Sequence, residues 1–150
     1  MSDAGLRSGD KALAIDLGSR RIGLAVSDRA GSMAFPHSVI ERSNDPAADL
    51  AAIAGAVEET GATTVVVGLP LSLDGTDGPA ARTARAQAGE LAAALGGTTV
   101  VLFDERLTTV SAQAALNAAG RRGRQQRAVV DSAAATVLLQ SWLDAGRPIR

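Results

Sequence analysis

Three carboxylates in this sequence stand where a strand ends or a helix begins, and they are the side chains best placed for chemistry. Asp16 closes an apolar run and is followed by Gly18, which lets another group approach the backbone closely. Glu105 follows the apolar run that ends at Phe103, and Asp131 falls in the first turn of an apolar helical pattern. Carboxylates from strand ends and a helix start can converge on one edge of a sheet.

The types of side chain limit the chemistry that these acids could support. The chain has no cysteine and a single histidine, His37, which excludes a thiol nucleophile and any cysteine-ligated or histidine-rich metal site. Hard oxygen ligands favour Mg²⁺ or Mn²⁺ over zinc, and such sites usually act on phosphate esters. Each acid taken alone is at least as compatible with a structural role as with a catalytic one, and for Asp131 that role would be helix capping.

Other catalytic patterns are absent from the sequence. It contains no G-x-S-x-G, Walker A or G-x-G-x-x-G segment. His37 follows Pro36 and is interpreted as a loop residue, not as a general base. Phe35, Phe103 and Trp142 are expected to pack in the interior, so we expect no aromatic platform for stacked bases.

Positive charge is concentrated in the last third of the chain, although the net charge is −1. From residue 106 to residue 150 there are seven arginines against two acids. Four of these arginines fall in the segment RRGRQQR, at Arg121, Arg122, Arg124 and Arg127. The segment could contact a polyanion, but charge alone favours a solvated loop.

Short runs of apolar and β-branched residues predict five strands, at residues 13–17, 22–28, 33–40, 63–68 and 98–103. A tight polar turn joins the first two runs, which is typical of an antiparallel hairpin. The third run contains Pro36, so it is predicted to be an edge strand or an irregular one.

Helical periodicity predicts four helices, at residues 45–60, 79–95, 109–119 and 129–145. The first begins at Asp45-Pro46 and is followed by Gly61. Its apolar positions recur at spacings of three and four, at Leu50, Ile53, Ala54 and Val57. A hairpin followed by strand–helix–strand units predicts an α/β fold with a mixed five-stranded sheet, antiparallel over its first three strands and then parallel, flanked by helices.

The length of 150 residues suits one domain, which we place at residues 11–146. Residues 1–10 are expected to form a disordered tail, and residues 147–150 a short C-terminal tail. The start lacks the apolar run of a secretory signal, and no apolar run approaches the ~18 residues of a membrane span. We therefore expect a cytoplasmic protein with no membrane contact.

Four segments together resemble the YqgF/RuvX family. They are AIDLG through GLAVSD at residues 14–28, VGLPL with DGT at residues 67–76, DERLTT at residues 104–109 and VDSAAA at residues 130–135. The first segment alone is a weak signal, but the four in this order are specific. The resemblance covers the chain from about residue 11 to residue 146.

The resemblance implies a ribonuclease H-like fold, related to the RuvC junction resolvases, and a metal-dependent nuclease. Its nucleic-acid partner would be pre-16S ribosomal RNA, processed at the 5′ end, or alternatively branched DNA cut as a Holliday junction. Carried over by position, the acidic site would be Asp16, Glu105 and Asp131, holding Mg²⁺ or Mn²⁺. Asp28 and Asp104 are candidates for auxiliary acids.

The same resemblance favours nucleic-acid contact for Arg106 and for the four arginines of the RRGRQQR segment. The segment at residues 120–127 is richer in arginine than is usual in the family, so substrate choice stays open.

Two other classes of function stay open. DLG at residues 16–18 with GLA at residues 23–25 also resembles the first phosphate loop of sugar kinases and actin-like ATPases, although those proteins pair two related domains and this chain has room for one. A non-catalytic nucleic-acid-binding module would keep the fold, but the presence of all three carboxylates argues against it. No apolar stripe identifies a dimer surface, so a monomer and a homodimer are both compatible with the sequence.

Overall fold

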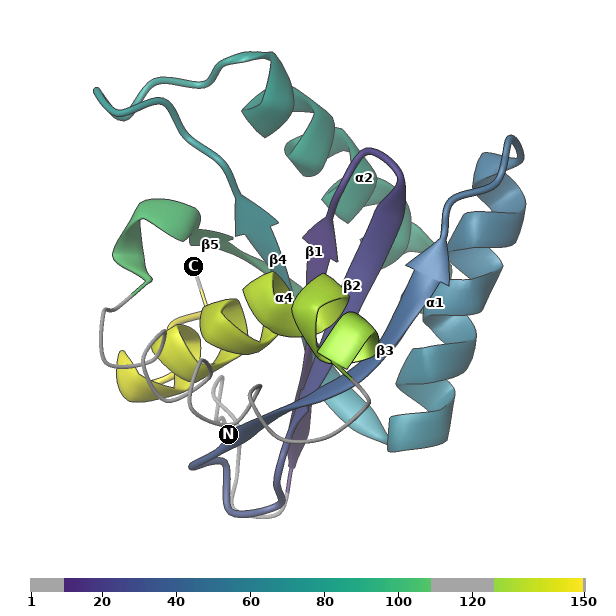
Figure 1. Ribbon diagram of the computed structural model, residues 1–150, viewed down its shortest axis with the longest axis vertical. Helices are drawn as coiled ribbons and strands as arrows, with labels where there is room; N and C mark the ends of the chain where they lie inside the picture. The colour runs from purple at the N-terminus through teal and green to yellow at the C-terminus, as the bar shows by residue number, and fades with distance from the viewer. Residues whose placement is uncertain (1–9, 109–125, 150) are drawn as a thin grey trace.

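The computed structural model describes residues 10–108 and 126–149, with side chains described over 10–108 and 132–149. Its elements (Figure 1) are β1 (Lys11–Leu17), β2 (Arg21–Ser27), β3 (Ala34–Glu41), α1 (Pro46–Thr60), β4 (Ala62–Leu69), α2 (Pro79–Leu95), β5 (Thr99–Asp104), the short 3₁₀ helix η1 (Glu105–Leu107) and α4 (Gln126–Asp144). The helix predicted at residues 109–119 and the arginines at positions 121, 122 and 124 lie outside the described residues.

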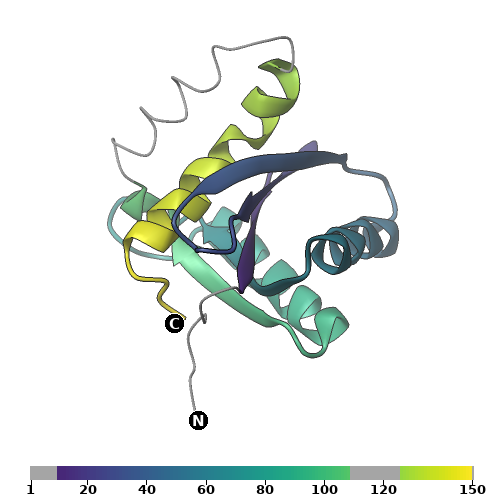
Figure 2. The same ribbon diagram turned by 90° about the horizontal axis from the view of Figure 1, so that it is seen from below.

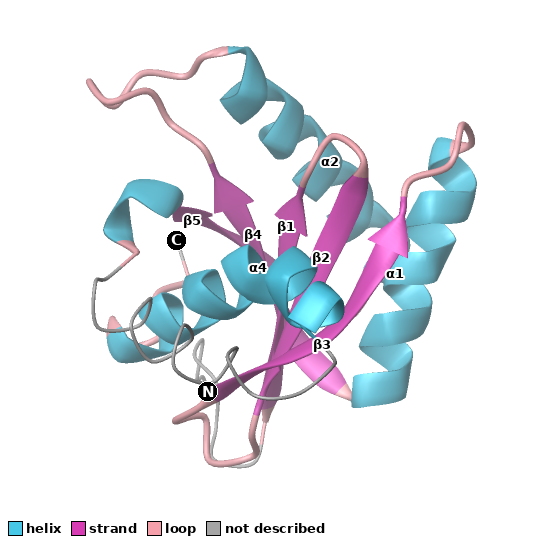
Figure 3. Cartoon of the chain, in the orientation of Figure 1, coloured by secondary structure: helices cyan, strands magenta, loops and turns pink. Residues whose placement is uncertain are grey.

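The strands form one mixed sheet of five, in the order β3-β2-β1-β4-β5 (Figure 3). β2 is antiparallel to both β1 and β3, whereas β4 is parallel to β1 and β5 is parallel to β4. The predicted fold class is therefore confirmed. Pro36 lies on the edge strand β3, where pairing with β2 shifts register, because proline cannot donate to the ladder.

Helices cover both faces of the sheet (Figure 2). On one face α4 packs over a core that includes Ala14 and Trp142. On the other face α1 and α2 pack over a core that includes Ile15 and Leu91. Successive residues of a strand point to opposite faces, so Ala14 and Ile15 enter different cores although they are neighbours in β1.

Local sequence sets the limits of α1. Asp45 caps its first turn with a side chain that accepts a hydrogen bond of 3.1 Å from the backbone two residues later. Pro46 begins the helix, and Gly61 ends it at a φ of 74°, a left-handed conformation that glycine adopts without strain. The predicted apolar face is confirmed, with Ile53 and Val57 buried.

Three predictions about single elements are wrong. His37 lies within β3 and not in a loop, because β2–β3 pairing continues past Pro36 after the register shift. Phe35 is 48% exposed instead of packed, because β3 lies at the edge of the sheet. α4 begins at Gln126, three residues before the predicted start at 129.

The segment at residues 147–149, predicted as part of a C-terminal tail, packs against the domain. Nε1 of Trp142 donates to the carbonyl of Pro148 at 2.6 Å. Nη2 of Arg147 donates to the carbonyls of Ala30 and Gly31, both at 3.1 Å. None of the helices in the described ranges is long and apolar enough to cross a membrane.

Candidate active site

Asp16 and Glu105 come together because β1, β4 and β5 are parallel neighbours, and their paired residues point to the same face of the sheet. The last residue that each strand places in the core beneath α4 is apolar, namely Ala14, Val66 and Phe103. Two residues further along, where this core ends, the three positions are Asp16, Gly68 and Glu105. Since β4 lies between β1 and β5, the two acids flank a glycine at one end of the sheet.

Gly68 makes room for the Glu105 side chain. A Cβ atom at residue 68 would collide with Oε2 of Glu105 and would lie 3.2 Å from its Cγ and Cδ atoms. The φ of Gly68 is not positive, so the glycine is needed here for space and not for backbone conformation. Sequence reasoning missed this residue, although a glycine that ends the run TTVVV is a signal for close approach.

Both carboxyl groups lie where ionisation is costly. Burial raises the pKa of Asp16. Burial also raises the pKa of Glu105, and the negative charges of Asp16 and Asp104 raise it further. A cation between partly buried like charges removes both the repulsion and much of the desolvation cost. The pair therefore suits a divalent metal ion that prefers carboxylate oxygens.

A cavity of about 170 Å³ lies against both carboxylates, between the sheet and α4. Its lining comes from the two acids and the residue after η1 on one side and from α4 on the other: Asp16, Glu105, Thr108, Ala134, Val137 and Leu138. One water occupies about 30 Å³ of liquid, so the cavity has room for an ion together with several waters.

The third predicted acid, Asp131, belongs to the same helix. It precedes Ala134 by three residues, which places the two positions on one face of α4. Its side chain lies outside the described residues. Among the side chains that the structure describes, no three histidine, cysteine or acidic groups gather as a metal site. The structure thus brings together Asp16 and Glu105 and sets position 131 on the helix that covers them.

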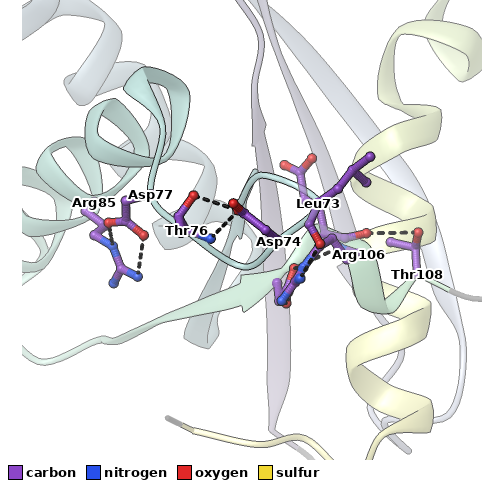
Figure 4. A network of polar contacts seen from close by, with 9 residues as sticks. Leu73, Asp74, Thr76, Asp77, Arg85, Arg106 and Thr108 are labelled. Atoms are coloured by element: carbon purple, nitrogen blue, oxygen red, sulfur yellow. Dashed lines mark hydrogen bonds and ion pairs between the residues drawn. The ribbon is translucent and has the colours of Figure 1, made fainter.

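Arg106 ties the loop between β4 and α2 to the end of β5 (Figure 4). Its Nε and Nη2 atoms donate to the Asp104 carboxylate at 3.0 and 2.7 Å, and Nη1 donates to the carbonyl of Leu73 at 3.3 Å. The Arg106 guanidinium lowers the pKa of Asp104. The Asp104 carboxylate also accepts a hydrogen bond of 2.9 Å from the backbone N–H of Arg106, which caps the start of η1. Asp104 and Arg106 therefore fix the turn that presents Glu105, while nucleic-acid contact by Arg106 stays a prediction.

Local bonds order the rest of that loop (Figure 4). The Asp74 carboxylate accepts from the hydroxyl of Thr76 at 2.7 Å and from its backbone at 3.0 Å. Asp77 pairs with Arg85 of α2 at 2.7 Å. Leu73 is 96% exposed beside these contacts. The loop between β4 and α2 is therefore tied to the end of β5 at Leu73 and to α2 at Asp77.

Asp28, a candidate auxiliary acid, lies at the opposite end of the sheet. In the β1–β2 ladder Asp16 pairs with Gly23, whereas Asp28 follows the far end of β2. Its carboxylate accepts hydrogen bonds from the backbone of Ser32 at 2.9 Å and of Met33 at 3.3 Å, and these belong to the β2–β3 turn. Asp28 stabilises that turn and does not contribute to this site.

Comparison with known families gives one match over nearly the whole chain. Residues 10–145 match the model of the family RuvX, described as Holliday junction resolvase.

Several curated proteins are also similar to this chain over most of its length, each with the name "Putative pre-16S rRNA nuclease". The protein of Kineococcus radiotolerans is 50% identical over 135 residues, which cover 90% of this chain and 72% of that protein. The protein of Anaeromyxobacter dehalogenans is 49% identical over 92% of this chain and 99% of its own length. The protein of a Nocardioides species is 49% identical over 96% of this chain and 90% of its own length.

Among solved structures, the fold matches RuvC of Thermus thermophilus. The structure of that protein with a Holliday junction substrate gives a TM-score of 0.57 at 18% identity, over 92% of this chain and 97% of that one. A second structure of Thermus thermophilus RuvC gives a TM-score of 0.58 at 16% identity, over 91% and 97% of the two chains. At this identity the match establishes a shared ribonuclease H-like fold.

Proposed function

This chain belongs to the RuvX family, and from this membership and its paired carboxylates we propose that it is a metal-dependent nuclease that hydrolyses phosphodiester bonds. The substrate that we propose is the 5′ end of pre-16S ribosomal RNA, cut in the cytoplasm during ribosome biogenesis. The name shared by relatives of 49% and 50% identity supports this substrate. The observation that carries the proposal is the approach of Asp16 and Glu105 across Gly68 beside a cavity.

We assign Mg²⁺ or Mn²⁺ to Asp16, Glu105 and Asp131, because carboxylate oxygens are the ligands that these ions prefer. When bound, the ion supplies positive charge to the phosphate and lowers the pKa of a bound water. The protein holds the ligands in place: Gly68 lets Glu105 approach β1, and α4 closes the cavity over both acids. Substrate phosphate would enter where the sheet ends.

The description of the family favours a second candidate, cleavage of Holliday junctions. The same acids would serve, because the chemistry at the phosphodiester bond is the same. A resolvase must cut two strands symmetrically, so it would act as a homodimer, whereas an RNA-processing enzyme could act as a monomer. A non-catalytic module that binds nucleic acid on the same fold is the third candidate.

The decisive experiment offers purified protein two end-labelled substrates, a pre-16S 5′-leader RNA and a synthetic four-way DNA junction, with Mg²⁺ or Mn²⁺. We expect cleavage of the RNA only, lost in EDTA. Paired symmetric cuts in the junction would instead identify a resolvase. Binding of either substrate without any cut would identify the non-catalytic module, and cleavage that persists in EDTA would contradict metal dependence.

The RRGRQQR segment gives a prediction about substrate binding. Replacement of Arg121, Arg122, Arg124 and Arg127 by alanine is expected to flatten the dependence of affinity on salt, by about 0.7–0.9 in log–log slope for each phosphate that the protein no longer neutralises. The measurement is fluorescence anisotropy of labelled RNA from low to moderate salt. Arg29→Ala, in the β2–β3 turn far from Asp16, is the control. An unchanged slope in the quadruple variant would show that the segment does not bind phosphates.

A further inference from the structure

A second hollow, besides the acidic cavity, is lined by Glu105. It is a groove of about 340 Å³ between the β1–β2 turn and α2, lined among others by Gly18, Ser19, Arg42, Thr83 and, at one end, Glu105. Glu105 thus lines both hollows.

Arg42 is held in the groove by the β1–β2 turn. Its Nε atom donates to the carbonyl of Gly18 at 2.6 Å, and its backbone N–H donates to the carbonyl of Arg20 at 2.9 Å. These bonds leave both Nη groups of a partly buried guanidinium without a partner among the described residues. A guanidinium that is fixed through Nε is preorganised to bind an anion with its Nη groups.

Arg42 has acidic neighbours among the described residues but forms no ion pair with them: Asp49 and Glu90 line another hollow together with it, and Glu105 lines the groove. Most arginines near this end of the molecule are paired, as Arg21 is with Glu41 at 2.9 Å and Arg106 is with Asp104 at 2.7 Å. Arg20 and Arg42 have no such ion pair within the described part of the chain. An unpaired, partly buried cation beside a groove favours an anionic ligand.

We propose that this groove binds the phosphate group next to the one that is cut, with Arg42 as its principal ligand. The proposal rests on the proposed nuclease function, because it needs a phosphodiester chain that passes Glu105. A polymer whose scissile phosphate lies at Asp16 and Glu105 places its next phosphate on one side of Glu105 or the other. The groove offers a cation there, and none of its described lining residues is an aromatic ring that would stack a base.

The test measures binding separately from cleavage. In an Asp16→Asn background, which keeps the substrate intact, Arg42→Gln is compared with Arg29→Gln by fluorescence anisotropy on the leader RNA and on the four-way junction. Arg29 is exposed in the β2–β3 turn, so its replacement removes the same charge far from the groove. We expect Arg42→Gln to weaken binding about tenfold and to lower the salt slope by about one, with little effect of the control. Weaker binding of the leader RNA would show that the groove binds RNA, and weaker binding of the four-way junction would show that it binds DNA.

A second pair of variants tests the groove without changing Arg42, whose replacement could disturb the β1–β2 turn. Thr83→Glu places a negative charge on the rim of the groove, while Ala92→Glu places one on an exposed position of α2 outside it. We expect only the first to weaken binding.

Single methylphosphonates in the substrate that the wild type cuts identify the phosphate itself. The neutral group next to the cut should weaken binding in the Asp16→Asn parent and have no further effect once Arg42 is replaced. Equal affinities of Arg42→Gln and Arg29→Gln, both folded, would overturn the proposed phosphate site while leaving the nuclease proposal intact. A parent that binds neither substrate would overturn both.

Discussion

Asp16→Asn is expected to reduce cleavage at least about a thousandfold while raising the melting temperature of the metal-free protein. The reduction follows because a metal ligand that contributes several kcal/mol to the transition state is removed, at about 1.4 kcal/mol for each tenfold. The gain in stability follows because the carboxylate is partly buried beside Glu105 and its pKa is raised by that burial. An amide of the same shape carries no charge to desolvate.

The sign of the pH dependence follows from the raised pKa of Asp16. In the folded protein this carboxyl binds its proton more tightly than in the unfolded chain. The free energy of unfolding therefore falls as the pH rises from the ordinary pKa of an aspartate through the raised one. The difference in melting temperature between Asp16→Asn and the wild type should be small near pH 4 and should grow toward neutral pH.

Divalent metal should reverse this difference. Mg²⁺ or Mn²⁺ binds only the folded state, so it should raise the melting temperature of the wild type and raise that of Asp16→Asn much less. Asp28→Asn is the matched control, because the backbone N–H of Ser32 lowers the pKa of Asp28. That variant should keep full activity and lose stability. If Asp16→Asn is less stable than the wild type at neutral pH without metal, the ionised Asp16 carboxylate does not lower the free energy of unfolding.

Much of the fold follows from local sequence, because strand alternation and helix caps act over a few residues. The β1–β2 hairpin and the caps of α1 at Asp45 and Gly61 follow from short patterns that the structure confirms. The edge position of Phe35 does not follow, since exposure there depends on which strand lies beside β3.

The site follows only in part from sequence, for the same physical reason. Asp16 and Glu105 could each be singled out as acids at strand ends, but their approach depends on β4 lying between β1 and β5. The contribution of Gly68 depends on the Glu105 side chain, which follows a different strand 37 residues later in the chain and occupies the space beside it. Arg42 likewise gains its place from Gly18, which lies 24 residues earlier. Such contacts are set by tertiary packing and not by local propensity.

Gly68→Ala is expected to lower cleavage about a hundredfold with little change in stability. The added methyl group would occupy the space of the Glu105 carboxylate. The end of a flexible side chain can move away, so the fold should change by less than about 1 kcal/mol, because alanine also reduces the freedom of the unfolded chain. A displacement of about 1 Å at a catalytic group can cost about a hundredfold in rate, so the same movement should be severe for activity.

Gly89→Ala is the matched control for this prediction, because a Cβ atom there meets no atom within 4 Å. It lies inside α2, so alanine should stabilise the protein by about 0.5–1 kcal/mol and leave cleavage unchanged. Rates are measured on the substrate that the wild type cuts, and melting temperatures with and without Mn²⁺. Gly68→Ala should also show a smaller stabilisation by Mn²⁺, since a displaced Glu105 holds the ion less well. If Gly68→Ala cleaves at the wild-type rate, cleavage does not depend on the place of the Glu105 carboxylate beside Gly68. The assignment of Glu105 as a metal ligand would then have to be abandoned.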